Sequence, residues 1–193
     1  MKKFIALLGL AVLMSGVSAQ AAHVVSLTDA QVRSIALSNL APFDLINWKV
    51  GDNAQYDVTV GSFGKMGTST KTVTKDEGTS LWVEQNMDLS IQKQKVEIQI
   101  SKADGKVLKT IVNGQEQTTP EDPIQIISQD YTDVTVPAGN FKAIHIVAKT
   151  KQVDHIEVWA NPRDTVMDGT LKQAMTTQGI DIVMALTSFK RSN

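Results

Sequence analysis

Apolar and polar residues alternate along most of the chain after Pro42, as in the KVEIQI run at residues 95–100. A period of two, carried largely by β-branched residues, predicts strands with one buried and one exposed face. The predicted strands cover residues 54–61, 67–75, 80–91, 93–103, 106–112, 131–137, 141–150, 153–160, 170–177 and 180–189.

Turn residues separate these strands. Asp104-Gly105 and Asn113-Gly114 favour two-residue hairpins, because a type I′ turn needs positive φ at both central positions. No helical pattern of about 10–15 residues lies between strands, which argues against a parallel α/β sheet. The sequence therefore predicts a mainly β (α+β) fold: a single curved antiparallel sheet, or half-barrel, of about ten strands.

One helix is predicted before the first strand. Thr28 and Gln31 form a T-x-x-Q capping box, in which the hydroxyl caps one free backbone N–H and the amide reaches back to another. Pro42 ends the helical pattern. The stripe of this helix is apolar except for one asparagine, and consists of Val32, Ile35, Ala36, Asn39 and Leu40. We expect the helix to cover the concave face of the sheet with this stripe.

The first residues have the three parts of a secretory signal peptide. Lys2 and Lys3 precede an apolar run over residues 4–14, and Ala19-Gln20-Ala21 is an A-x-A cleavage site. The apolar run is shorter than the roughly 20 residues that cross a bilayer, so no transmembrane segment is predicted. We expect a signal peptide at residues 1–21 and one domain at 22–193, periplasmic or secreted after cleavage near Ala21-Ala22.

Composition narrows the function classes. The formal net charge is −1, which gives no reason to expect binding to nucleic acid. The chain has no cysteine, so disulfides and thiolate chemistry are excluded. No G-x-S-x-G motif occurs, and no motif predicts a cofactor. Asp130 and Asp133 flank Tyr131 near a predicted strand start, where acids are common. These features favour a protein that is not an enzyme.

Two of the three histidines supply the strongest candidate chemistry. In a hairpin of strands 141–150 and 153–160 with a three-residue loop, His145, His155 and Glu157 share one face, with His145 opposite Glu157. Diagonal neighbours on such a face are about 7–8 Å apart. Two imidazoles and a carboxylate are potential metal ligands, and a hydrogen-bonded polar pair on the sheet is the simpler interpretation.

The tryptophans are candidate ligand-binding residues. Trp82 and Trp159 share parity with polar residues of their strands, and Trp48 precedes the first strand. Indole rings on the less apolar side of a curved sheet can line a groove, or they can pack beneath a loop or helix.

Two stretches support a resemblance. One is WKVGD at residues 48–52, followed by Tyr56, and the other runs from VTVPAGNF at 134–141 to VWANP at 158–162. In this order they resemble a family of exported bacterial proteins of unknown function, similar in fold to the LolA-like periplasmic lipoprotein carriers and receptors. The resemblance implies a strongly curved antiparallel sheet with a helix against its concave face. In the carriers that concavity holds acyl chains.

Three functions follow as hypotheses. The first is a non-enzymatic periplasmic protein that binds a lipid, or the acyl chains of a lipoprotein, in the half-barrel groove. The second is an envelope interaction module with a filled core, whose protein partner binds along an open sheet edge. The third is a metal-dependent hydrolase centred on His145, His155 and Glu157. Large side chains at inward positions would favour the second hypothesis over the first.

Overall fold

The structure is a computed structural model that describes residues 48–193 except 91, 118–124, 150–152, 154 and 178. The predicted signal peptide and N-terminal helix lie outside the described residues. The described part contains one 11-stranded antiparallel sheet, in the order β6-β5-β4-β3-β2-β1-β11-β10-β9-β8-β7. Among the described residues, no helix is long and apolar enough to cross a membrane.

The strands form two groups along the chain. The first group is β1 (Asn53–Val60), β2 (Lys65–Asp76), β3 (Ser80–Leu89), β4 (Gln92–Ser101), β5 (Val107–Val112) and β6 (Gln115–Gln117), with the short 3-10 helix η1 (Gly61–Phe63) after β1. The second group is β7 (Gln125–Val136), β8 (Gly139–Lys149), β9 (His155–Ala160), β10 (Thr170–Thr177) and β11 (Ile180–Lys190). Successive strands within each group are neighbours in the sheet.

The two groups meet where β1 pairs with β11. This pairing joins residues far apart in sequence: the Thr187 hydroxyl donates to the Gln55 carbonyl over 3.0 Å. The pairing lies in the interior of the sheet order, so the first and last described strands are both central strands.

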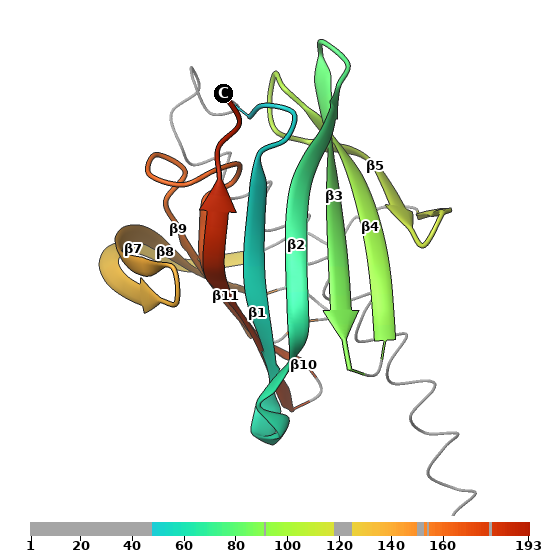
Figure 1. Ribbon diagram of the computed structural model, residues 1–193. Coiled ribbons are helices and arrows are strands. Elements are labelled where there is room, and N and C mark those ends of the chain that lie inside the picture. Colours follow the sequence, from blue (N-terminus) through green and yellow to red (C-terminus); the bar gives the residue numbers. More distant parts are fainter. Residues whose placement is uncertain (1–47, 91, 118–124, 150–152, 154, 178) are drawn as a thin grey trace, which may run out of the picture.

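The sheet is twisted and curls back on itself. In Figure 1, β1 to β4 stand nearly upright while β7 and β8 lie across the view at the left. At the turn between β7 and β8, the Ala138 N–H donates to the Leu186 carbonyl of β11 over 3.0 Å, although three strands separate β7 from β11 in the sheet. Phe141 of β8 and Phe189 of β11 also make an edge-to-face contact. The curl therefore brings the beginning of β8 into contact with β11.

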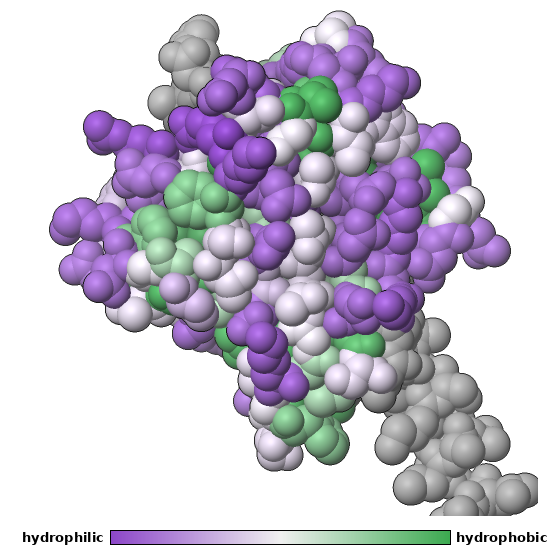
Figure 2. Space-filling model, viewed as in Figure 1, coloured by the Kyte–Doolittle hydropathy of each residue, from purple (hydrophilic) through white to green (hydrophobic). Residues whose placement is uncertain are grey.

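One face of the sheet, here called the inner face, carries the core. Its side chains come from alternating positions of the strands, as the period of two predicts. Large side chains fill it, with less than 2% of their surface exposed, and they include Tyr56, Leu81, Ile98, Ile100, Ile156, Met175, Met184 and Leu186. The opposite, outer face is mostly hydrophilic or neutral over β2 to β4 (Figure 2).

The inner face also holds polar groups. The Lys71 ammonium lies 3.5 Å from the Asp168 carboxylate, and both side chains are almost fully buried. The same ammonium lies 5.2 Å from the centre of the Tyr56 ring. Gln85 is opposite Lys71 and donates to the Ser69 hydroxyl over 3.0 Å. Charge pairing and hydrogen bonding reduce the free-energy penalty of burying these groups.

The predicted antiparallel sheet is confirmed, with three differences. The short strand β6 was not predicted, because the QEQ sequence at residues 115–117 has no apolar alternation. β7 begins at Gln125 rather than 131. The Asp104-Gly105 two-residue hairpin is wrong, since β4 ends at Ser101 and β5 starts at Val107. The Asn113-Gly114 turn is confirmed, with φ of 50° and 82°.

Candidate functional site

The strand β7 forms one end of the sheet and is its most exposed element. It has 12 residues, and all of those from Gln125 to Asp133 are exposed. In the sheet order its single neighbour is β8, so its other backbone edge is open among the described residues. The strand at the opposite end, β6, has 3 residues. A long open edge presents a row of unpaired N–H and C=O groups that can pair with another chain.

Three large apolar side chains of β7 are exposed. Ile126 is 40% exposed, Ile127 56% and Tyr131 83%. Ile126 and Tyr131 lie opposite Ala148 and Ile144 of β8. Ile127 stands at a register shift in the pairing with β8, where a bulge re-aims a side chain. Large apolar side chains therefore stay exposed on the strand at this end of the sheet.

Two carboxylates flank Tyr131 on this strand. Asp133 lies opposite Lys142, with 3.7 Å between carboxylate oxygen and ammonium nitrogen, and both side chains are more than four-fifths exposed. Asp130 lies opposite His145 on the outer face, 3.4 Å from its Nδ1, and is 59% exposed. The open edge is consequently acidic on both of its faces.

The structure brings His145, His155 and Glu157 together on the outer face beside β7. One carboxylate oxygen of Glu157 lies 2.8 Å from Nε2 of His145, and the other lies 2.8 Å from Nε2 of His155. The predicted register is wrong by two residues: His145 lies opposite Trp159 and diagonal to Glu157. The predicted three-residue loop at 150–152 lies outside the described residues.

This arrangement perturbs Glu157. Partial burial raises the pKa of its carboxyl, but hydrogen bonds and charge interactions with His155 and His145 outweigh burial and hold that pKa below its ordinary value. Among the described residues, no group of three or more His, Asp or Glu side chains has the arrangement to hold a metal ion. In this geometry each Glu157 oxygen is engaged by an imidazole rather than turned toward a shared centre, and the predicted metal role stays a prediction.

The three tryptophans do not line a common groove. Trp48 is 6% exposed and belongs to the core. Trp159 on β9 stacks on His145, with 4.4 Å between ring centres, and the Lys172 ammonium lies 4.6 Å from its ring. Trp82 is on β3, five places from β9 in the sheet order. Their predicted role in ligand binding stays a prediction.

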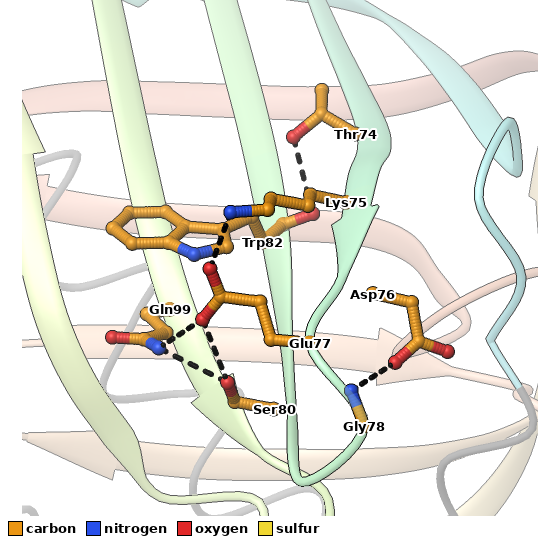
Figure 3. Close-up of polar contacts among 8 residues, drawn as sticks. All are labelled: Thr74, Lys75, Asp76, Glu77, Gly78, Ser80, Trp82 and Gln99. Carbon is orange, nitrogen blue, oxygen red and sulfur yellow. Dashed lines mark hydrogen bonds and ion pairs between the residues drawn. The ribbon is translucent and has the colours of Figure 1, made fainter.

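Trp82 lies beside a network of polar contacts at the turn between β2 and β3 (Figure 3). Glu77 accepts from the Lys75 ammonium over 2.6 Å and from the Gln99 amide over 2.9 Å. The hydrogen bond from Lys75 is the main reason that the pKa of Glu77 lies below its ordinary value. Since these polar groups are paired with each other, the network fixes the turn and presents no open ligand set.

Sequence reasoning missed the exposed edge. It predicted a strand only from Tyr131 and treated the flanking acids as ordinary residues of a strand start. The doublet Ile126-Ile127 was the available signal, but a bulge at Ile127 breaks the alternation that marks a strand.

The architecture defines an all-β protein, within the described residues, built on one open antiparallel sheet. No protein-family model matches the chain, and no curated protein matches it. Solved structures resemble it remotely. A hypothetical protein of Chlamydia trachomatis is 10% identical with a TM-score of 0.45, over 75% of this chain and 89% of that chain. A protein of Bacteroides fragilis, described as exported and with a YmcC-like fold, is 11% identical with a TM-score of 0.45, over 75% and 97%.

The complex of MucA and MucB from Pseudomonas aeruginosa also contains a similar chain. It is 12% identical with a TM-score of 0.42, over 86% of this chain and 58% of that chain. Each of these TM-scores lies below 0.5, so the likenesses define neither a family nor a function for this protein. The resemblance to lipoprotein carriers stays a prediction.

Proposed function

We propose that this protein is a non-catalytic envelope protein that binds a partner protein by adding an extended segment of the partner to β7. The open edge of β7, with its exposed Ile126, Ile127 and Tyr131, is the observation that carries the proposal. Main-chain hydrogen bonds to an added strand supply affinity, and contacts with alternate side chains supply specificity. The predicted signal peptide supports the envelope location.

The contrast with the other end of the sheet strengthens this proposal. Natural sheets blunt their edges with short strands, charges or bulges, because open edges aggregate. The edge at β6 has 3 residues, all polar. β7 keeps 12 residues and three exposed apolar side chains. A sheet that keeps a long, apolar edge strand at one end and a short, polar one at the other is expected when the long edge binds a partner.

Binding of a lipid in the concavity receives less support. An acyl chain needs unfilled apolar volume, since close-packed interiors have few voids larger than a water molecule. The inner face is instead filled by buried side chains such as Tyr56, Ile98 and Met184. Lys71 and Gln85 add buried polar groups at its centre. Inward positions occupied in this way favour the interaction module.

A second copy of this chain is a poorer occupant of β7 than a different protein. Pairing β7 with itself would bring Asp130 and Asp133 of two copies onto one ribbon. Like charges near one another across a strand pair are destabilising. The two carboxylates thus disfavour self-association through β7, but they do not oppose the binding of a positively charged partner.

Site-specific photocrosslinking tests the proposal in the bacterium that makes the protein. A benzophenone amino acid replaces Tyr131 in one strain and Leu108 in another, since Leu108 is a 57% exposed apolar residue on β5. We expect a crosslinked protein partner at position 131 and none at position 108.

The identified partner is then purified and mixed with the full mature chain. Hydrogen exchange measured by mass spectrometry should show protection of residues 125–133 on complex formation, because added-strand hydrogen bonds shield backbone N–H groups. Protection elsewhere with none in β7, or equal crosslinking at both positions, would contradict the proposal.

A further inference from the structure

We infer that the segment added to β7 carries two basic residues three positions apart, with a bulky apolar residue between them. This inference rests on the proposed function and names the chemistry of its partner. It follows from the order of Asp130, Tyr131 and Asp133 along one exposed strand and from the alternation of side chains between the two faces.

The acidic side chains remain available to a partner. Asp130 is 59% exposed and its neighbour across the strand pair is His145, at 3.4 Å. Asp133 is 83% exposed, and the Lys142 ammonium, 3.7 Å away, is itself 91% exposed. Contacts between such exposed groups are weak and exchange readily with water. Both carboxylates can therefore accept a further cation from the open side of β7.

The faces on which these residues lie fix the pattern of the partner. Tyr131 and Asp133 point to one face of β7 and Asp130 to the other, because side chains alternate along a strand and their partners on β8 are in register. In an antiparallel added strand, the residue beside Asp133 is followed two positions later by the residue beside Tyr131, and directly afterwards by the residue beside Asp130. The expected order is basic, any residue, apolar, basic. A parallel strand reads the same spacing in reverse.

Both kinds of contact are within reach. Side chains directly opposite on one face have Cβ atoms about 4.5–5.5 Å apart, so an Arg or Lys reaches the facing carboxylate without distortion. The apolar residue covers Tyr131, which is 83% exposed in the free protein. Arg suits these positions best, because its planar guanidinium engages a carboxylate through two hydrogen bonds.

Two fluorescein-labelled peptides test the inference with the full mature chain. One has the central sequence Arg-Thr-Val-Arg and the other has Glu-Thr-Val-Glu, in identical threonine-rich flanks. Fluorescence anisotropy should show saturable binding of the arginine peptide that weakens as salt is raised. The glutamate peptide should bind about tenfold more weakly or not at all.

Protein variants locate the effect. The double variant Asp130→Asn with Asp133→Asn should raise the Kd of the arginine peptide by about tenfold, because two exposed ion pairs are lost. Asp88→Asn is the matched control, since Asp88 is a 57% exposed carboxylate on β3. This control should leave the Kd unchanged.

The outcomes separate the inference from the proposed function. Equal binding of the two peptides, or binding that survives the double asparagine variant, overturns the charge pattern. If the variant Tyr131→Lys abolishes peptide binding in either of these cases, the open edge of β7 is still the binding site. If neither peptide binds but a partner crosslinks at position 131, the inference fails and the proposed function stands. Absence of both peptide binding and crosslinking overturns both.

Discussion

A single carboxylate, that of Glu157, links two histidines from neighbouring strands. Each of its oxygens lies 2.8 Å from one imidazole nitrogen. His145 in turn stacks on Trp159 and lies 3.4 Å from Asp130 of β7. The outer face thus has a continuous set of contacts that connects the edge strand to β9. These contacts orient β7, and they are the residue-scale feature that pH is expected to affect.

Replacement of Glu157 by Gln should change how stability depends on pH. A carboxyl whose pKa is lower in the folded than in the unfolded chain stabilises the folded state above its unfolded pKa, about 4.3 for Glu. That stabilisation is lost as pH falls through the folded pKa. The difference in Tm between the natural chain and Glu157→Gln should be largest near neutral pH and should shrink below about pH 4.

Thermal unfolding followed by circular dichroism measures this difference across the pH range. Asp133→Asn is the control, because Asp133 is 83% exposed and its ion pair with Lys142 is open to water. Its Tm difference should stay small at every pH. A Glu157→Gln difference that grows on acidification would contradict the sign assigned to Glu157.

Sequence parity, together with an assumed loop of odd length, placed His145, His155 and Glu157 on one face. It did not fix which residues lie opposite each other, because register depends on the length of the β8–β9 loop. Residues 150–154 (TKQVD) contain no glycine or Asn-Gly pair to specify a turn type. The register prediction was therefore wrong by two residues, although the cluster itself was predicted.

At the scale of elements, the two ends of the sheet differ in length and in chemistry. β7 is long, apolar at Ile126, Ile127 and Tyr131, and acidic at two positions, whereas β6 is a polar strand of 3 residues. The central strands were predictable because alternation marks strands with one buried face. Both end strands were harder to predict, since a strand exposed on both faces has no buried parity to mark it.

Hydrogen exchange of the free protein should reflect this difference in position. We expect the backbone amides of residues 125–133 to exchange much faster than those of 180–190, because β7 has one strand neighbour and β11 has two. Mass spectrometry of peptic fragments makes the comparison at one pH and temperature. Comparable protection in the two segments would mean that the β7 edge is already covered in the isolated protein.

At the scale of the whole described region, most of the core lies on one side of one sheet. The side chains that would have to leave room for a ligand are themselves buried and packed together. The sequence predicted a curved sheet with a concave face, and the curl is present in the contact of the β7–β8 turn with β11. Whether that face is open or filled was not predictable, because it depends on how side-chain volumes fit across strands distant in sequence.

Native mass spectrometry tests the filled face. The protein, purified from the cells that make it without added detergent, should have the mass of its polypeptide alone. Lipid extraction of the same sample should yield no stoichiometric lipid. A reproducible added mass that passes into organic solvent would instead support the lipid-binding hypothesis and identify the class of lipid.

The pairing of β1 with β11 has a consequence for the order of folding. The centre of the sheet joins residues more than 120 positions apart, and the bond between Thr187 and Gln55 spans 132 positions. A chain made from its amino end can assemble the hairpins of β1 to β6 early, but β1 keeps one edge uncovered until β11 arrives. Such distant pairings raise contact order and slow folding. Loss of the last strand would therefore divide the sheet through its middle rather than trim its margin.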